Sequence, residues 1–440
     1  MNVRSFFFLT SERSFIFIKP TIKNMNTKHT IATVSILAAV TLANAAGYQI
    51  LEQGASNMGN AVAGASVNAN QDATCAFWNP SSAAFMPLEV GQTRVDASVF
   101  GVIPTLWCTG TQTSNPYTQT GTNKEGDCSA DSVVPQLYVA HKFSDRIDGT
   151  LSITAPWGLE SDYNKDWIGG FQALHSYLMT VDINPSISFK VTDWLAVSGG
   201  VSAQYAYCRL TNAVPAVLGG GDQRFSGDDV AVGGNIGFTI KYAENGRIGF
   251  HWRSAVEHEL KGTARGTLYN MSISADMHMP NTFDIGWYQR LDGDLREFAI
   301  MAEYAYMTWS QFEDLTIPEA GVYVEENWKD TSRISVGFHY YPEYIEDLTL
   351  RFGVCYDESP IRNAELRTPR IPCSDRLWLS TGIGYKFGNY SIDICYSYIF
   401  VLGDGEMSRT ENAGTPLQNT LSGNYAAHIH VVGAQFGVKF

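Results

Sequence analysis

Once its first 45 residues are set aside, the sequence lacks any apolar run long enough to cross a membrane as a helix, which needs about 20 residues. Charge is also scarce: 17% of the 440 residues are charged, and the net charge is −14. An acidic chain has no electrostatic affinity for nucleic acid, so we exclude that partner. If the protein lies in a membrane, it must be a closed β-barrel, because only helices and barrels satisfy every backbone group in lipid.

The short motifs of enzymes and metal sites are missing too. Neither GxSxG nor HExxH occurs, and no CxxC or Cys/His spacing suggests a metal. We therefore expect no catalytic residue, metal or cofactor. Seven cysteines follow the leader, and Cys108 with Cys128, or Cys355 with Cys373, could each close a loop in an oxidising compartment. The odd number leaves at least one thiol unpaired.

The N-terminus is typical of an export signal. A short basic start at 25–28 precedes an apolar run at 31–42 and the small-x-small pattern at 43–45. We predict a cleaved signal peptide over 1–45, with Met25 as a candidate for the true start, and hence export to the bacterial outer membrane.

The rest of the chain alternates strand-like runs with connections. The predicted strands are 90–103, 132–143, 146–157, 175–190, 194–209, 225–242, 246–258, 279–291, 296–309, 331–342, 347–357, 376–388, 390–402 and 428–440. The long connections are 104–131, 158–174, 210–224, 259–278, 310–330, 358–375 and 403–427, and short turns alternate with them. Long outer loops and tight periplasmic turns in strict order are typical of an outer-membrane barrel. We predict an all-β fold, an antiparallel transmembrane β-barrel of about fourteen strands over 89–440.

Side chains within the predicted strands alternate with a period of two. Between 390 and 400, Ile392, Ile394 and their even-numbered neighbours are apolar, whereas Ser391 and Asp393 belong to a small or polar face. This pattern predicts an apolar outside and a polar lumen. The chain ends on such a strand at Phe440, and that strand must pair with the first to remove both sheet edges.

Segment 46–88 has a different composition. It has only two charged residues, is rich in Ala, Gly and Asn, and shows no sustained alternation. Its aromatic residues weigh against a disordered periplasmic tail, which is the alternative. We predict that this segment, named the hatch here, fills the lumen of the barrel as a plug.

Several segments, in order along the chain, resemble the long-chain fatty acid transporter family of outer-membrane proteins, which includes importers of aromatic hydrocarbons. The segments are AGYQILEQGASNMGNAVAG at the start of the hatch, Asn79-Pro80-Ser81, TAPWGLESDY at 154–163, NPSISFKVTDWLAVSGGVS at 184–202, HWRSAVEHELKG at 251–262, YMTWSQFEDL at 306–315, NWKDTSRISVG at 327–337 and IPCSDRLWLSTGIGYKF at 371–387. Ser81 and Trp157 depart from the Ala and Phe that the family usually has.

The resemblance implies a fourteen-stranded barrel with a hatch whose motif is Asn79-Pro80. It also implies a hydrophobic groove among the outer loops, a tighter inner site that includes Tyr48, and a kink in the third strand for sideways release. Pro156 ends that strand, and a proline removes a ladder hydrogen bond. By the same resemblance Lys329 is the expected partner of a ligand carboxylate. Arg209, at the outer end of the fifth predicted strand, is second, and Arg253 and Arg333 are weaker candidates because cations inside barrels often pair with lumen carboxylates.

A fatty acid gains about 0.8 kcal/mol for each methylene that leaves water, so it needs a lined path rather than a pump. Its buried carboxylate needs a cationic partner. The outer loops offer apolar candidates for the path, namely Leu210, Val214, Leu218, Leu268 and Met271. The expected function is passive transport of long-chain fatty acids or other hydrophobic small molecules by a monomer in outer-membrane lipid. An open porin or adhesin, and a lipid hydrolase of the outer membrane, are the alternatives.

Overall fold

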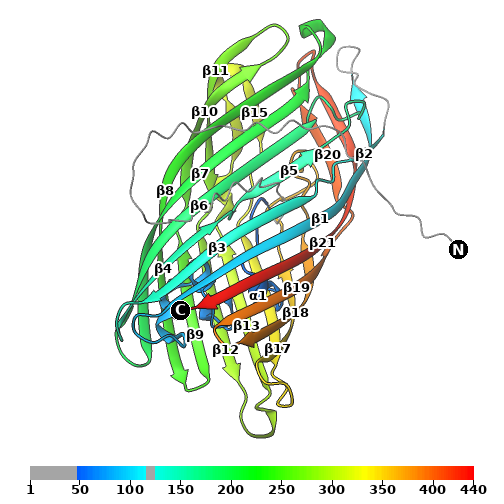
Figure 1. Cartoon of the computed structure of the whole chain (residues 1–440). Helices are drawn as coiled ribbons and strands as arrows, with labels where there is room; N and C mark the ends of the chain where they lie inside the picture. Colours follow the sequence, from blue (N-terminus) through cyan, green and yellow to red (C-terminus); the bar gives the residue numbers. More distant parts are fainter. Residues whose placement is uncertain (1–46, 115–123) are drawn as a thin grey trace, which may run out of the picture. The chain divides into compact units, whose positions relative to one another are not determined.

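A computed structural model describes residues 47–114 and 124–440, so the proposed signal peptide lies outside the described residues. One antiparallel sheet closes on itself, because β1 (Thr93–Ser114) pairs with β3 (Ser132–Lys142) on one side and with β21 (Asn419–Lys439) on the other (Figure 1). Among these residues, no helix has both the length and the hydropathy that a membrane span requires.

The predicted barrel of fourteen antiparallel strands is confirmed, and three of its strands are each split in two. The further unbroken strands are β6 (His175–Lys190), β7 (Leu195–Ala213), β8 (Asp222–Ala243), β13 (Phe298–Met307), β16 (Thr331–Tyr340), β17 (Leu348–Asp357), β18 (Arg376–Phe387) and β19 (Tyr390–Val401). The split strands are β4 (Ile147–Thr154) with β5 (Gly158–Asp162), β9 (Gly246–Arg253) with β10 (Val256–Arg265), and β11 (Asn270–Met279) with β12 (Thr282–Arg290).

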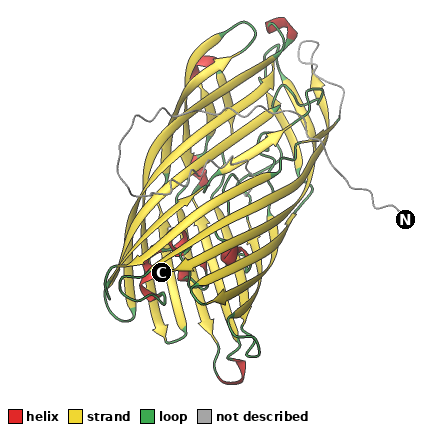
Figure 2. Ribbon diagram, viewed as in Figure 1, coloured by secondary structure: helices red, strands yellow, loops and turns green. Residues whose placement is uncertain are grey.

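The remaining elements are short and lie in the connections or the hatch (Figure 2). The outer connections contain β2 (Glu125–Asp127), β14 (Asp314–Ile317), β15 (Val322–Glu325), β20 (Glu406–Glu411), η3 (Ala216–Leu218), η5 (Trp309–Gln311) and η6 (Pro318–Ala320), and one tight turn contains η4 (Gly293–Leu295). The hatch contains α1 (Ala55–Met58), η1 (Ala65–Val67), α2 (Cys75–Trp78) and η2 (Pro80–Phe85).

The two faces of the strands are as predicted. On β19, Ile392 and Ile394 are 43% and 50% exposed, whereas Ser391 and Asp393 are 4% exposed. The exposed apolar face contacts lipid, where apolar side chains are favoured. The polar face is buried because the hatch fills the lumen behind it.

The outer parts of the strands are longer than predicted. β1 continues to Ser114, β21 begins at Asn419, and β10 and β11 occupy most of the region 259–278 that was expected to be a loop. Above the lipid both faces of a strand contact water or other loops, so Glu257, Glu259 and Lys261 can point outward from β10. The apolar–polar alternation disappears there, and with it the sequence signal for a strand.

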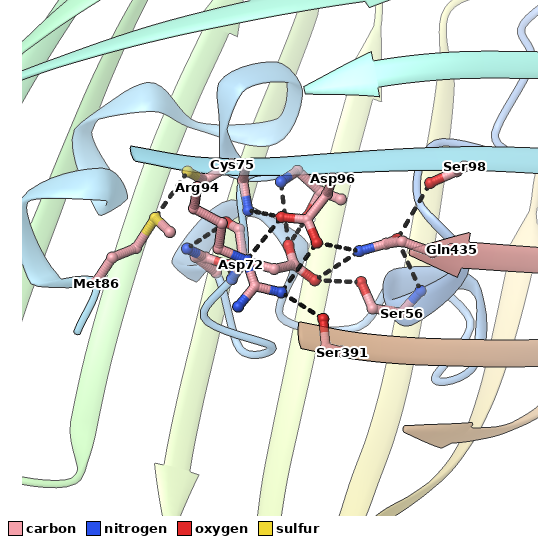
Figure 3. Close-up of polar contacts among 12 residues, drawn as sticks. Ser56, Asp72, Cys75, Met86, Arg94, Asp96, Ser98, Ser391 and Gln435 are labelled. Carbon is pink, nitrogen blue, oxygen red and sulfur yellow. Dashed lines mark hydrogen bonds and ion pairs between the residues drawn. The ribbon is translucent and has the colours of Figure 1, made fainter. Parts of the chain in front are cut away.

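A buried polar network fixes the hatch to the seam where β1 meets β21 (Figure 3). Asp96 of β1 accepts a hydrogen bond from the backbone N–H of Ala73 at 2.8 Å and forms an ion pair with Arg94 at 2.7 Å. Gln435 of β21 donates to Asp72 at 3.2 Å and to Asp96 at 3.3 Å. The hatch therefore binds both edge strands through one set of side chains.

Asn79 and Pro80 attach the hatch to another part of the wall. The Asn79 side chain accepts a hydrogen bond from the backbone N–H of Ser81 and so caps η2, with Pro80 in the first turn. Its amide donates to the carbonyl of Ser66 at 2.7 Å and to the carbonyl of Phe238 in β8 at 3.2 Å. One side chain thus connects two turns of the hatch to the barrel.

Candidate functional site

The wall is interrupted between β4 and β5, where Pro156 lies. The N–H of Trp157 donates to Oγ1 of Thr180 at 3.0 Å. The first residues of the hatch complete the site: Ile50 donates to the carbonyl of Pro156 at 2.9 Å, and Gly158 donates to the carbonyl of Tyr48 at 2.8 Å. Residues 48–50 of the hatch therefore pair with residues 156–158 at the break, like a very short strand.

The break leaves two neighbouring strands unjoined. The ladder of β3 with β4 covers 137–142 on β3, and β5 pairs with β6 on its other side. Within 47–114 and 124–440, no ladder pair joins β5 to β3. The wall thus has a lateral discontinuity next to the start of the hatch.

Tyr48 lies at the centre of an aromatic cluster behind the break. Its ring centroid is 4.6 Å from that of Trp309, 5.6 Å from that of Trp328 and 6.1 Å from that of Phe312. Trp157 contacts Trp309 with centroids 5.5 Å apart. The Tyr48 hydroxyl is satisfied by the carbonyl of His278 at 3.0 Å. The cluster closes the inner end of an apolar cavity.

The apolar cavity extends outward from Tyr48 between the loops and the upper wall. Its apolar and aromatic lining comprises Leu159, Tyr177, Leu178, Cys208, Leu210, Phe225, Leu260, Ile273, Met277, Phe312, Leu315, Ile317 and Ile371. Charged side chains are few in this lining, and two of them, Glu326 and Arg370, come from outer loops. A mostly apolar cavity with a few polar groups is the usual form of a small-molecule site.

A second, larger cleft lies among the outer loops. Val214 and Leu218 line it, as does the hairpin of β14 with β15. Both the cleft and the cavity are lined by Leu210, Phe225, Leu315, Ile317 and Arg370. The shared walls make the cleft and the cavity two parts of one path.

Arg370 stands where the cleft meets the cavity. Its side chain is buried, no described carboxylate lies within 4.0 Å of it, and its Nη1 has no hydrogen-bond partner among the described residues. Burial lowers the pKa of the Arg370 guanidinium. An unpaired buried cation is costly, so an anionic group bound here would be strongly favoured.

Glu326 faces the same cavity. Burial raises the pKa of its carboxyl to about 8, and the nearby Arg409 offsets part of that rise. Its Oε2 accepts a hydrogen bond from Nε1 of Trp328 at 3.1 Å. At neutral pH this carboxyl is mostly protonated, so it offsets little of the charge of Arg370, on which the carboxylate of Glu411 acts more strongly.

The two cations favoured from the sequence lie elsewhere. Lys329 forms a close ion pair with Glu358, and neither the cavity nor the cleft includes it. Arg209 alternates along β7 with Cys208 and Leu210, which line the cavity, so its side chain belongs to the opposite face. Its guanidinium lies 5.7 Å from the ring centroid of Tyr177, its ladder partner on β6, so Arg209 lies beside the cavity without being part of its lining.

The weaker candidates pair with lumen carboxylates. Arg253 is 3.7 Å from Asp182 and lies over the ring of Phe77, and Arg333 donates to Gln49 at 2.8 Å and lies 3.5 Å from Asp284. Both arginines are therefore engaged inside the barrel below the cavity.

The apolar candidates separate into two groups. Leu210 lines the cavity and the cleft, and Val214 and Leu218 line the cleft. Leu268 and Met271 are 75% and 37% exposed and line neither. Arg370, Phe312 and Trp309 were not among the predicted site residues, because nothing local in the sequence distinguishes a loop residue that folds inward.

Comparison with known proteins agrees with this geometry. The family model described as "Outer membrane protein transport protein (OMPP1/FadL/TodX)" matches residues 36–440. A long-chain fatty acid transport protein of Escherichia coli O6:H1 is 27% identical over 424 residues, covering 86% of this chain and 92% of that protein. Outer membrane protein P1 of Haemophilus influenzae is 27% identical over 422 residues, covering 84% and 89%.

Solved structures share the fold. The crystal structure of a Pseudomonas aeruginosa FadL homologue superposes with a TM-score of 0.81 at 23% identity, covering 89% of this chain and 99% of that chain. The Ralstonia pickettii toluene transporter TbuX gives a TM-score of 0.54 at 18% identity, covering 82% and 93%. These identities support the architecture and leave the ligand open.

Proposed function

Because the chain belongs to the OMPP1/FadL/TodX family of outer-membrane transport proteins, we propose that it carries long-chain fatty acids from the cell surface into the outer membrane by passive diffusion. Family membership confirms three expectations: a bacterial outer-membrane location, transport of hydrophobic compounds, and a role as a transporter rather than an enzyme. The identity of the ligand is the part that we propose.

The observation that most supports this proposal is the buried Arg370 at the junction of the cleft and the cavity. A fatty acid places its hydrocarbon chain among apolar side chains and its carboxylate on this guanidinium. Each buried methylene contributes about 0.8 kcal/mol, so the chain supplies most of the affinity. The charge-assisted hydrogen bond to the carboxylate supplies about 1.5–3 kcal/mol more and fixes the orientation.

The lateral discontinuity between β3 and β5 is the proposed release point. The hatch residues Tyr48 and Ile50 lie across it, and Tyr48 also closes the inner end of the cavity. A small movement of the hatch start would therefore open the cavity toward the lipid. No energy source is needed, because the ligand leaves water for hydrocarbon.

Uptake by cells with and without the protein tests this proposal. Labelled oleate and labelled toluene are supplied in parallel, because aromatic hydrocarbons fit an apolar cavity without using Arg370. We expect faster oleate uptake with the protein, and loss of that gain in Arg370→Met, which keeps most of the volume and removes the charge.

Arg362→Met is the matched control, since Arg362 is also a loop arginine but donates to the carbonyls of Asn327 and Trp328 outside the cavity. Equal oleate uptake with and without the protein would overturn the proposal. Toluene uptake that persists in Arg370→Met while oleate uptake is absent in every strain would reassign the ligand to uncharged aromatics.

A further inference from the structure

We propose that the periplasmic end of the lumen contains a binding site for a small soluble phosphate, such as inorganic phosphate or a phosphate monoester, formed by Arg247 and Arg290 beside the hatch. The site is separate from the outer cavity, and it does not depend on which compound the protein transports. It lies among the tight turns, which are at the lower end of the barrel in Figure 1.

A cavity of about 540 Å³ opens between the hatch and these turns. On the hatch side its lining consists of residues 69–71. On the wall side it is lined by the inner ends of β9, β12, β16, β17 and β18 and by the turns after β8 and β16. Tight turns lie on the periplasmic side of an outer-membrane barrel. The cavity is therefore open to the periplasm and separated from lipid by the wall, so its occupant must be a polar solute.

Two arginines of this cavity lack a carboxylate partner. Elsewhere in the lumen Arg253, Arg333 and Arg351 each lie within 4.0 Å of a carboxylate. Arg247 and Arg290 both line the cavity, and no carboxylate of the described residues lies within 4.0 Å of either guanidinium. A buried cation without a counter-charge is costly. An anion from the periplasm would supply the missing charge.

Arg247 is buried and presents a free donor. It is 7% exposed, its Nη2 donates to the carbonyl of Asn68 at 3.3 Å, and its Nε has no hydrogen-bond partner within the described chain. The guanidinium lies 4.9 Å from the ring centroid of Tyr288. Stacking on an aromatic ring orients a guanidinium and leaves the donors at its edge for an oxyanion.

Arg290 is close enough to bind the same anion. Its backbone N–H donates to the carbonyl of Asn245 at 3.0 Å, and Arg247 lies two residues further along the chain from Asn245. The two arginines are thus diagonal neighbours on adjacent strands, where Cα atoms are about 7–8 Å apart and long side chains can meet. The Arg290 guanidinium lies 4.4 Å from the ring centroid of Tyr341.

The two aromatic rings join the arginines into one unit. The hydroxyls of Tyr288 and Tyr341 are 3.3 Å apart, and the hydroxyl of Tyr341 lies 2.9 Å from Nδ1 of His339. Arg290 uses its Nε for the carbonyl of Arg296 at 3.0 Å, which leaves its terminal nitrogens for a ligand. Two oriented guanidiniums on one connected frame match the several acceptor oxygens of a phosphate.

The acidic side chains of the cavity lie at its mouth. Glu244, Glu346 and Asp347 belong to the turns and are exposed, and Glu343 forms an ion pair with Arg296 outside the lining. Solvent and salt screen exposed charges over about 10 Å, and they screen buried charges much less. A compact anion that passes the mouth is therefore attracted by the arginines, whereas a long polyanion would remain beside the carboxylates. This arrangement favours a small phosphate.

A bound phosphate would connect the wall to the hatch. The hatch turn 68–71 has positive φ at Asn68 and Gln71, 50° and 54°, so its conformation depends on the contacts around it. Two of these contacts come from the wall, namely the bond from Arg247 to Asn68 and the bond from Nε of Arg351 to Oδ1 of Asn70 at 2.7 Å. A phosphate between Arg247, Arg290 and the turn would hold the hatch more firmly.

Calorimetric titration of the purified protein in detergent with inorganic phosphate tests the site, with chloride keeping the ionic strength constant. Hydrogen exchange of residues 68–72 is measured in the same buffers. We expect saturable binding, and slower exchange when phosphate is present. In Arg247→Met the affinity should fall by about tenfold or more, as expected for the loss of one charge-assisted hydrogen bond.

Arg146→Met is the matched control, because Arg146 is an exposed arginine in the tight turn before β4 and does not line the cavity. We expect it to bind phosphate like the natural protein. Arg290→Met serves if Arg247→Met does not assemble, and the same fall in affinity is expected. Because the change caused by phosphate is compared within each variant, a general loosening of the hatch would not imitate it.

Absence of saturable phosphate binding by the natural protein would overturn the site. Undiminished binding in Arg247→Met or in Arg290→Met would overturn it too. Binding of phosphatidylglycerol in mixed micelles, without binding of free phosphate, would overturn a soluble ligand in favour of a lipid headgroup. Oleate uptake by cells tests the proposed function separately, because neither arginine lines the outer cavity or cleft.

Discussion

The ring of Tyr48 meets the ring of Trp309 edge to face, with centroids 4.6 Å apart and planes inclined by 83°. Tyr48 belongs to the start of the hatch, and Trp309 to the outer connection after β13. Through this contact the start of the hatch touches the outer connection whose Phe312 lines the cavity. A displacement of either ring would therefore change the packing of the other.

Replacement of Tyr48 should loosen the start of the hatch. Tyr48→Ala removes the centre of the aromatic cluster, and a buried aromatic replaced by alanine costs about 3–5 kcal/mol. Tyr48→Phe keeps the ring and loses only the bond to His278, at about 1 kcal/mol. Hydrogen exchange of residues 48–51 measures the effect. Equal protection in both variants would show that the ring contacts do not hold the hatch.

The affinity for fatty acids should fall as the pH rises. The pKa of Glu326 is raised to about 8 by burial. Below that pH the carboxyl is neutral, and above it the anion competes with the ligand carboxylate for Arg370. Titration of a fluorescent fatty acid between about pH 7 and about pH 9 measures the change.

Glu326→Gln removes the titrating group and should flatten this pH profile. The same group affects stability with a definite sign. The folded protein retains a proton that the unfolded chain releases above its ordinary pKa of 4.5, so its stabilising contribution is full below pH 4.5 and is lost as the pH rises through about 8. A pH profile unchanged by Glu326→Gln would exclude Glu326 as its cause.

Asn79 should control how tightly the lumen is plugged. Asn79→Ala leaves the buried carbonyls of Ser66 and Phe238 without their donor, at about 1–3 kcal/mol for each group left unsatisfied. Asn79→Asp keeps the cap on η2 and loses the donors. We expect a higher ionic conductance in planar bilayers for both variants, and the larger increase for Asn79→Asp, because its buried carboxylate faces the two carbonyls that the amide bonded. Conductance equal to that of the natural protein would contradict this.

The buried ion pair at the seam should matter far more than an exposed one. Asp96→Asn weakens the pair with Arg94 and the bond to Ala73, and breaking a buried pair costs about 3–5 kcal/mol. Glu259→Gln disrupts the exposed pair with Lys261, which solvent screens, so almost no loss of stability is expected. The temperature at which the barrel loses its compact gel mobility compares the two. Equal shifts would contradict the prediction.

The part of the fold that faces lipid could be predicted from the sequence. In 390–400, Ile392 and Ser391 differ so strongly in polarity that a period of two is plain, and loop lengths fix the strand order. The outer ends of β1, β10 and β21 could not be predicted, because neither face of a strand touches lipid there. The residues at these outer ends lack the apolar–polar alternation of a strand, although the strands remain paired there.

The site was predicted less completely than the fold. Leu210, Val214 and Leu218 line the cleft or the cavity, as their apolar character indicated, and Tyr48 lines the cavity, as the family resemblance implied. Arg370 carries no such signal. Whether a loop cation finds a carboxylate, as Lys329 does with Glu358, depends on how separate loops pack. The pairing of a loop cation therefore depends on tertiary packing, which no local sequence pattern specifies.

The seam between β1 and β21 is also a point of attachment for the hatch. Gln435, on the last strand to be synthesised, bonds to Asp72 of the hatch and to Asp96 of the first barrel strand. The closure of the barrel seam and the attachment of the hatch therefore depend on the same side chain, so a change at Gln435 would weaken both at once.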